Sequence, residues 1–193
     1  DRTADGPVNR KTGARIAACV PMHTFGLPCR IHEIADICRQ FAIPLVEDAA
    51  ESLGSYLNGK HTGNFGQLST LSFNGNKIIT TGGGGMILTN DVDLAVSAKH
   101  LTTTAKVPHA WEFEHDQIGF NYRMPNLNAA LGCAQMEVLP EMLRIKAEVA
   151  EHYRVFCRAN GLKFIEPIDG AVANFWLNAV CLRDKTERDE FLQ

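Results

Sequence analysis

The sequence predicts an α/β protein in which a mostly parallel sheet is flanked by helices. Short apolar runs alternate with segments whose apolar residues recur at helical spacing. Near the N-terminus an apolar run, a helical pattern and a second apolar run follow within about 35 residues, which is the length of a βαβ unit. The strands of such a unit are parallel and its crossover is right-handed. The 193 residues are enough to bury a sizeable core.

The elements of this first unit are defined by apolar runs and prolines. Residues 15–20 form an apolar run that stops at Pro21, as a buried strand does. Residues 31–41 place their apolar side chains on one face of an amphipathic helix. A second buried strand is expected at 43–48, and it ends at Asp48.

The remaining elements continue the alternation. We expect strands at 68–73, 85–89 and 174–182, a helix at 90–101 capped by Asn90 or Asp91, and a long helix at 125–159 interrupted or kinked at Pro140. The last ten residues resemble the start of a further helix rather than the end of a domain. The chain is therefore expected to be a fragment of a longer protein.

Composition argues against several classes of partner. The formal net charge is −3 and no Lys/Arg run is present, which argues against a nucleic-acid surface. No apolar stretch approaches the roughly 20 residues that span a bilayer, and the first residues lack the apolar core of a signal peptide. These observations predict a cytoplasmic protein with no membrane partner.

The cysteines favour a reducing compartment and no metal. None of the six forms a C-x-x-C pair, and most lie in apolar, periodic segments, so we interpret them as reduced core thiols. A zinc site built from Cys29, His32 and Cys38 is the alternative. Its spacing matches no common zinc arrangement, and Cys38 belongs to the apolar face of the expected helix.

The segment SFNGNKIITTGGGG, which begins at Ser72, raises a question of chemistry because a lysine, Lys77, precedes four consecutive glycines. The nucleotide-binding loop places its glycines before the lysine, so that motif is excluded. Asp48, Ser72 and Lys77 all follow or end strands, where α/β sheets bind ligands. An amine, an acid and a hydroxyl match the needs of pyridoxal phosphate, which bonds a lysine amine and pairs its ring nitrogen with a carboxylate. The glycines would let the backbone pass close to the lysine and cofactor.

The same residues allow a plainer interpretation. An aspartate after a strand often caps a helix, so Asp48 could be the cap of a helix starting in EDAAES. A lysine after a strand, such as Lys77, is usually solvated. Spacing and composition alone leave both interpretations open.

Three motifs in register resemble a known family. VEDAAESLGS, SFNGNKIITTGGGGMILTND and GFNYRMPNLNAALGCAQME are similar in order and spacing to the DegT/DnrJ/EryC1/StrS aminotransferases. The resemblance implies the pyridoxal-phosphate aminotransferase fold type I. It implies that residues 1–150 belong to the large cofactor-binding domain and that 151–193 begin the C-terminal small domain. The family's upstream phosphate turn and ring-stacking aromatic would precede Asp1, so the chain alone is expected to bind the cofactor weakly or not at all.

The resemblance also implies roles for individual residues. Lys77 looks like the Schiff-base lysine, Asp48 like the partner of the pyridine nitrogen, and Ser72 like the phosphate-binding serine. Asn121 is similar to the asparagine that reaches the phosphate of the neighbouring subunit's cofactor, which implies a homodimer with shared active sites. Glu51 occupies a position near the cofactor's phenolic oxygen where the family often has His or Gln.

The reaction implied is transfer of an amino group from glutamate to C4 of a nucleotide-linked 4-keto-6-deoxy sugar, in surface-glycan biosynthesis. The motifs look most like the LegC/PglE-like branch, which favours UDP-2-acetamido-2,6-dideoxy-hexos-4-ulose as acceptor. A dTDP- or GDP-linked keto-sugar is the alternative substrate, and a non-catalytic protein that keeps the fold is the alternative class. Sugar dehydratases of the family carry histidine in place of the lysine, so Lys77 argues against them.

Overall fold

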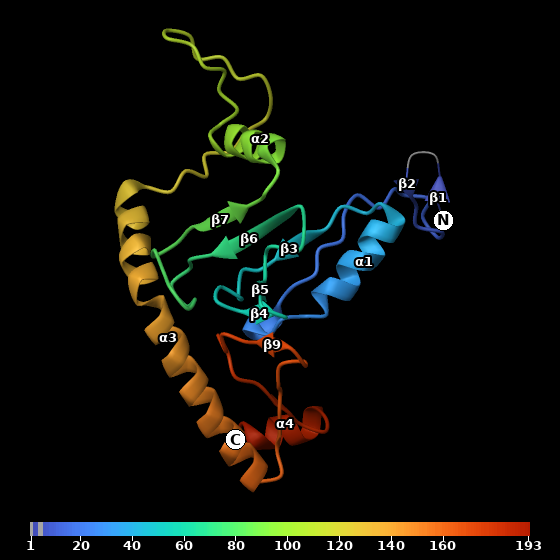
Figure 1. Cartoon of the computed structure of the whole chain (residues 1–193), viewed down its shortest axis with the longest axis vertical. Helices are drawn as coiled ribbons and strands as arrows, with labels where there is room; N and C mark the ends of the chain where they lie inside the picture. The colour runs from blue at the N-terminus through green and yellow to red at the C-terminus, as the bar shows by residue number, and fades with distance from the viewer. Residues whose placement is uncertain (1, 4–5) are drawn as a thin grey trace.

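The computed structural model describes residues 2–3 and 6–193 (Figure 1). Its strands are β1 (Arg2–Thr3), β2 (Gly6–Pro7), β3 (Val46–Asp48), β4 (Tyr56–Leu57), β5 (Lys60–His61), β6 (Leu68–Ser72), β7 (Gly85–Leu88), β8 (Lys163–Phe164), β9 (Ala171–Val172) and β10 (Val180–Cys181). Its helices are α1 (Ile31–Phe41), α2 (Val92–Thr102), α3 (Asn126–Ala159) and α4 (Lys185–Phe191), with a 3-10 turn, η1 (Thr24–Gly26). The expected α/β class is confirmed, although five strands, β3 to β7, follow one another between α1 and α2.

The sheet at the centre has the order β3-β6-β7. Strands β3 and β6 are parallel, with Asp48 opposite Thr70, whereas β7 runs antiparallel, with Gly85 opposite Ser72. Because β3 and β6 point the same way, Asp48 and Ser72 lie at the same edge of the sheet. This is the carboxyl edge, where ligands bind in α/β proteins.

The strand expected at 15–20 is wrong as a regular element. An irregular extended segment pairs with β3 instead, through parallel bridges from Cys19 to Leu45 and from Met22 to Asp48. Between the bridges lies Pro21, which accepts a hydrogen bond from the Asp48 N–H (2.9 Å) but has no N–H of its own to donate. The parallel pairing was therefore expected correctly, but the proline interrupts its ladder.

Helix α1 agrees with its expected bounds and packs on the sheet by the expected face. Ile31, Ala35 and Cys38 are buried in one cluster with Leu45 and Leu57. Burial of each large aliphatic side chain contributes about 1.5–3 kcal/mol, which is enough to hold an 11-residue helix in place. Figure 1 shows α1 lying across the strand layer from the long helix α3.

A hairpin that was not expected from the sequence follows β3. Strands β4 and β5 are antiparallel and joined by Asn58 and Gly59, which have φ values of 50° and 77°. Two positive φ values in a two-residue loop define a type I′ turn, for which Asn-Gly is the preferred sequence. Strand β9 adds to β4 on the other side and brings the C-terminal part of the chain against this hairpin.

The helices after β7 correct one expectation and confirm another. Asp91 caps α2, because its side chain accepts hydrogen bonds from the N–H groups of Asp93 and Leu94. Helix α3 continues through Pro140 for 34 residues, so the expected interruption is wrong. A proline removes one backbone donor, and the helical turns on both sides retain theirs. The expected domain boundary at residue 150 lies within this helix and stays a prediction.

The strand expected at 174–182 is also wrong, because only β10 is a strand there. Phe175 has a φ of 48°, which no strand allows. The Asn174 side chain accepts a hydrogen bond from the Trp176 N–H at 2.8 Å, so it folds the backbone back on itself. The segment 174–176 is a bend whose side chains are buried.

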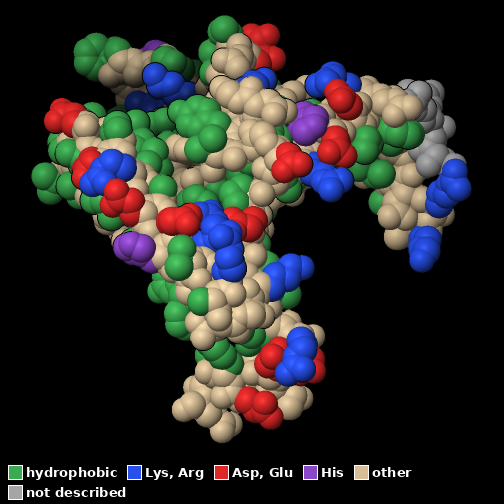
Figure 2. Space-filling model, turned by 60° about the horizontal axis from the view of Figure 1, so that its bottom comes forward, with side chains coloured by type: hydrophobic (Ala, Val, Ile, Leu, Met, Phe, Trp, Pro, Cys, Tyr) green, Lys and Arg blue, Asp and Glu red, His purple; other side chains and the backbone are tan. Residues whose placement is uncertain are grey.

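Acidic and basic side chains are interspersed on the face of the molecule in Figure 2. On α3, Arg144 pairs with Glu141 and Glu148, at helical spacings of three and four residues. Hydrophobic side chains also reach the surface of α3, where Leu127 is 84% exposed. Within residues 2–3 and 6–193, no helix combines the length and apolar character needed to cross a bilayer.

Candidate active site

The carboxyl edge of the sheet holds two of the predicted site residues. Asp48 ends β3, and its Oδ1 accepts a hydrogen bond from the Ala50 N–H at 3.2 Å. Ser72 ends β6, and its hydroxyl oxygen accepts from the Asn74 N–H at 3.4 Å. Each side chain thus bonds the turn that follows its own strand. Residues 49–54 form turns with no helix, so the alternative in which Asp48 caps a helix is wrong.

Lys77 lies in the loop after β6, and its side chain is only 13% exposed. Its Nζ is 3.9 Å from Glu51 Oε1 and 3.9 Å from the centre of the Trp176 ring. The alternative of a solvated lysine is therefore wrong. The amine lies between a carboxylate and an aromatic face, and both attract a positive charge.

Glu51 is fixed by the turn η1. Its Oε2 accepts a hydrogen bond from the Phe25 N–H at 2.6 Å, while Oε1 faces Lys77. Phe25 has φ 62° and ψ 13°, a left-handed conformation that costs a non-glycine residue free energy. The bond to Glu51 helps to offset that cost. Glu51 is therefore a preorganised neighbour of Lys77.

Asn174, which no sequence motif indicated, joins the turns around the site. Its Nδ2 donates to the carbonyls of Glu51 and Leu53 at 2.8 and 2.9 Å, and its N–H donates to Ser55 Oγ. The Ser55 hydroxyl in turn donates to the Gly26 carbonyl at 2.7 Å. Asn174 is 1% exposed, and these bonds fix the backbone at Glu51 and in the turn that follows it.

Trp176, also missed from the sequence, joins the same bend to the lysine loop. Its Nε1–H donates to the Asn76 carbonyl at 2.6 Å, directly before Lys77. Its own carbonyl accepts from Lys146 Nζ at 2.8 Å, and burial lowers the pKa of Lys146. Lys77, Lys146 and Trp176 line a hollow of about 250 Å³. No local pattern in NFWLN indicated this role, because it depends on a contact with a loop 100 residues earlier.

A buried acid–imidazole pair supports the strand that carries Asp48. Glu47 is fully buried, and its carboxylate accepts hydrogen bonds from His23 Nε2 at 3.1 Å and from the N–H groups of Gly63, Phe65 and Gly66 at 2.5–2.7 Å. Burial would raise the pKa of Glu47, but these four donors outweigh it and lower the pKa. His23 Nδ1 accepts from the Cys29 N–H, which leaves the ring proton on Nε2.

Asn121 lies apart from these residues. It is exposed in the segment between α2 and α3, where it bridges to Thr103, and its Oδ1 accepts from Arg123 Nε at 3.1 Å. The structure does not bring it together with Lys77 in one chain. Its action on a partner subunit's cofactor stays a prediction.

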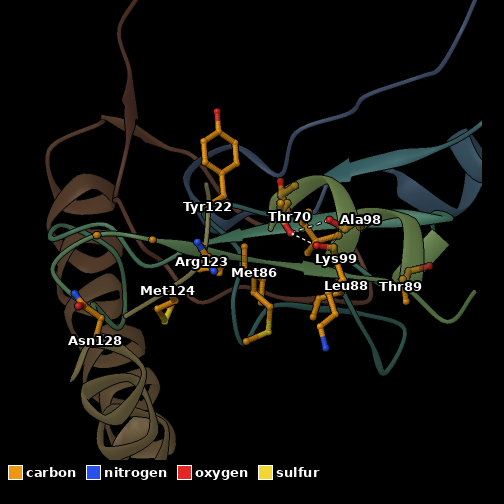
Figure 3. Close-up of a pocket in the computed structure, with 18 of the residues that line it drawn as sticks. Thr70, Met86, Leu88, Thr89, Ala98, Lys99, Tyr122, Arg123, Met124 and Asn128 are labelled. Atoms are coloured by element: carbon orange, nitrogen blue, oxygen red, sulfur yellow. Dashed lines mark hydrogen bonds between the residues drawn. The ribbon is translucent and has the colours of Figure 1, made fainter. Parts of the chain in front are cut away.

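The glycine run has a role in the turn before β7, and its expected role beside the cofactor stays a prediction. Gly82 and Gly84 have φ values of 79° and 114°, and they reverse the chain into β7. The run lines a groove of about 1260 Å³ between β7, α2 and the start of α3, into which Met86, Lys99 and Arg123 extend (Figure 3). None of the predicted site residues lines this groove. The predicted site therefore lies at the sheet edge, beside Lys77 and Glu51, and not in this larger groove.

The cysteines and histidines form no metal site in the part of the chain that the structure describes. All six cysteines are free thiols, and Cys38 and Cys157 are buried. Cys133 and Cys181 are exposed, so the expectation of core positions is wrong for these two. Burial and the nearby Glu47 carboxylate raise the pKa of Cys29 to about 11, which keeps this thiol protonated.

The donor set at the sheet edge fits pyridoxal phosphate. A poorly solvated lysine amine, a carboxylate and a hydroxyl come from the ends of two adjacent parallel strands and the loop beyond them. Among the described residues Asp48 Oδ2 has no hydrogen-bond partner, and the Ser72 hydroxyl accepts one long bond. Both groups are therefore able to bond a ligand.

Comparison with known proteins decides the family. The model of the DegT/DnrJ/EryC1/StrS aminotransferase family matches residues 3–193. The chain belongs to this family. It is 37% identical over 174 residues to the putative pyridoxal phosphate-dependent aminotransferase EpsN of Bacillus subtilis, covering 90% of this chain and 45% of the relative. It is 34% identical to the GDP-perosamine synthase of Vibrio cholerae, covering 93% and 49%.

Solved structures agree. The aminotransferase TlmJ from Streptoalloteichus hindustanus matches with a TM-score of 0.86 and 32% identity, over 93% of this chain and 49% of that one. The aminotransferase PseC from Helicobacter pylori, involved in pseudaminic acid biosynthesis, matches with a TM-score of 0.84 and 25% identity, over 91% and 48%. The chain spans about half the length of these relatives. The predicted fold type and the family's pyridoxal phosphate cofactor are confirmed.

Proposed function

We propose that the full-length protein containing this chain is a pyridoxal-phosphate aminotransferase that transfers an amino group from glutamate to a nucleotide-linked keto-sugar. The observation that carries the proposal is the poorly solvated Lys77 amine, 3.9 Å from Glu51, beside the strand ends that bear Asp48 and Ser72. Retention of these groups argues against a non-catalytic protein that only keeps the fold.

The chain's own residues would divide the work as follows. When bound, pyridoxal phosphate supplies an electrophilic carbon for amines and a ring that accepts electrons. Lys77 would bond the cofactor and, once released, move a proton between two carbon atoms as general base and acid. Asp48 would keep the ring nitrogen protonated, and the Ser72 hydroxyl would donate to the phosphate. Asn121 would complete the partner subunit's phosphate site in a homodimer.

For the acceptor we propose a 4-keto-6-deoxy sugar, with UDP-2-acetamido-2,6-dideoxy-hexos-4-ulose as the first choice. The ketone gives the amine a carbon to attack, and the nucleotide supplies remote binding energy that orients it. A GDP-linked acceptor is the second candidate, because GDP-perosamine synthases from three organisms are 34–37% identical to this chain. Glutamate as donor, the homodimer and a cytoplasmic location remain predictions.

The test uses purified full-length enzyme with glutamate and UDP-, GDP- and dTDP-linked 4-keto-6-deoxy sugars. We expect 2-oxoglutarate release with each turnover, an amino-sugar product by mass spectrometry and the highest kcat/KM with the UDP-N-acetyl sugar. Lys77→Ala should abolish turnover and the visible absorbance of the bound cofactor. Preference for the GDP sugar would overturn only the choice of nucleotide. No amine transfer to any sugar, or full activity of Lys77→Ala, would overturn the function itself.

A further inference from the structure

The proposed reaction does not explain the position of the Trp176 side chain beside the Lys77 amine. Trp176 reaches the lysine loop from the C-terminal bend and touches it twice. The indole N–H donates to the Asn76 carbonyl at 2.6 Å, and the ring face lies 3.9 Å from Lys77 Nζ. The first contact fixes the backbone that carries the lysine, and the second fixes the end of its side chain.

The two neighbours of the amine share one property. The Glu51 carboxylate and the Trp176 π face both attract an ammonium more strongly than a neutral amine. Lys77 Nζ lies 3.9 Å from each of them, so both contacts act on the end of the lysine side chain. Tryptophan has the strongest cation–π attraction of the aromatic side chains, so its identity matters here.

Both neighbours are themselves held rigidly. Glu51 accepts the Phe25 N–H at 2.6 Å, and Trp176 is only 9% exposed. The Trp176 N–H donates to Asn174 Oδ1, and its carbonyl accepts from Lys146 Nζ. Because Glu51 and Trp176 are already fixed, binding the ammonium between them costs little side-chain conformational entropy.

We propose that Trp176 is a positioning residue that, together with Glu51, forms a resting site for the protonated amine of Lys77 when this amine is not bonded to the cofactor. The inference rests on the proposed function for the role of Lys77 in catalysis. The distances around its amine do not depend on that function. A lysine that acts as general base becomes an ammonium when it takes the proton. The resting site holds that ammonium near the sheet edge until the proton is returned.

The test measures the reactivity of individual lysines in cofactor-free, full-length protein. The probe is the N-hydroxysuccinimide ester of acetic acid, which reacts with neutral amines, and each labelled lysine is quantified by peptide mass spectrometry. Trp176→Leu removes the ring face and the indole N–H. We expect Lys77 to be labelled roughly tenfold faster in this variant, the ratio that corresponds to about 1.4 kcal/mol of lost attraction. Glu51→Gln should give a smaller increase, and Trp176→Phe should lie between Trp176→Leu and the wild type.

Lys146 provides an internal control. It lines the same hollow, and its Nζ donates to the Trp176 backbone carbonyl, which every variant keeps, so its labelling should change by no more than about twofold. Trp111→Phe is the matched surface control, because Trp111 is 84% exposed, and it should leave Lys77 unchanged.

The outcomes separate the inference from the function. The resting site is overturned if Lys77 labelling is unchanged in Trp176→Leu and Glu51→Gln. It is also overturned if Lys77 and Lys146 rise together in Trp176→Leu while Glu51→Gln has no effect, because Trp176 would then only pack the hollow. Borohydride trapping of pyridoxal phosphate on Lys77 in the wild type tests the function separately. Absence of trapping there would overturn the function and leave the labelling result standing.

Discussion

Replacement of Glu47 by glutamine tests whether the buried carboxylate below Asp48 organises the sheet edge. Each carboxylate oxygen accepts two hydrogen bonds: Oε2 from His23 and Gly63, and Oε1 from Phe65 and Gly66. Glutamine keeps the shape but turns one oxygen into an amide nitrogen, which accepts nothing. Whichever oxygen is lost, two buried donors lose their acceptor.

The expected loss of stability follows from the two donors that are left without an acceptor. An unsatisfied buried donor costs about 1–3 kcal/mol, so Glu47→Gln should lower the free energy of unfolding by roughly 2–6 kcal/mol. Urea unfolding of full-length, cofactor-free protein at pH 7, followed by circular dichroism, measures the loss. Glu148→Gln is the matched control, because it removes a carboxylate that is 57% exposed on α3 and should change little. If Glu47→Gln were no more destabilising than Glu148→Gln, the four hydrogen bonds would not hold the edge.

The difference in unfolding free energy between the wild type and Glu47→Gln should depend on pH in a definite direction. The folded protein lowers the pKa of Glu47, because the hydrogen bonds outweigh the burial that would raise it. The ionised group therefore stabilises the fold fully above its unfolded pKa, about 4.3, and this contribution is lost as the pH falls through the lower folded value. The stability difference between the wild type and Glu47→Gln should be constant near neutral pH and shrink below about pH 4. A difference that grew on acidification would contradict the reasoning.

Three further predictions address the cofactor contacts and the turns. Asp48→Ala should slow the half-reaction with glutamate by roughly 100-fold, the scale seen when a charge-stabilising group is removed; an unchanged stopped-flow rate would leave Asp48 a structural residue. Mixing inactive Asn121→Ala and Lys77→Ala variants should restore some activity if subunits share sites, whereas no complementation under exchange conditions would argue against sharing. Gly26→Ala should destabilise the protein by about 2 kcal/mol or more, because a Cβ would lie 1.7 Å from Asn174 Oδ1. Gly59→Ala, also at positive φ but with open space around it, is the control and should cost about 1 kcal/mol; urea unfolding of both variants measures the difference.

The sequence by itself predicted several local elements, and it named the candidate site residues at the strand ends. Helix α1 was predictable because its apolar face has a helical period, and Asp91 was predictable as a cap because its side chain bonds the N–H groups that follow it. The motifs around Asp48 and Lys77 identified the family for the same reason. Their information lies in adjacent residues.

Only the tertiary structure decided what surrounds the lysine. Trp176 meets Asn76 across 100 residues, and Asn174 meets Glu51 across 123 residues, so no local pattern encodes either contact. The same contacts explain why 174–182 is not a regular strand. Alternation of apolar residues predicts which side chains are buried, but the side-chain hydrogen bonds of Asn174 outweigh the strand preference of its neighbours. Long-range hydrogen bonds of buried polar groups thus fix the surroundings of the residues that the sequence predicts for the site.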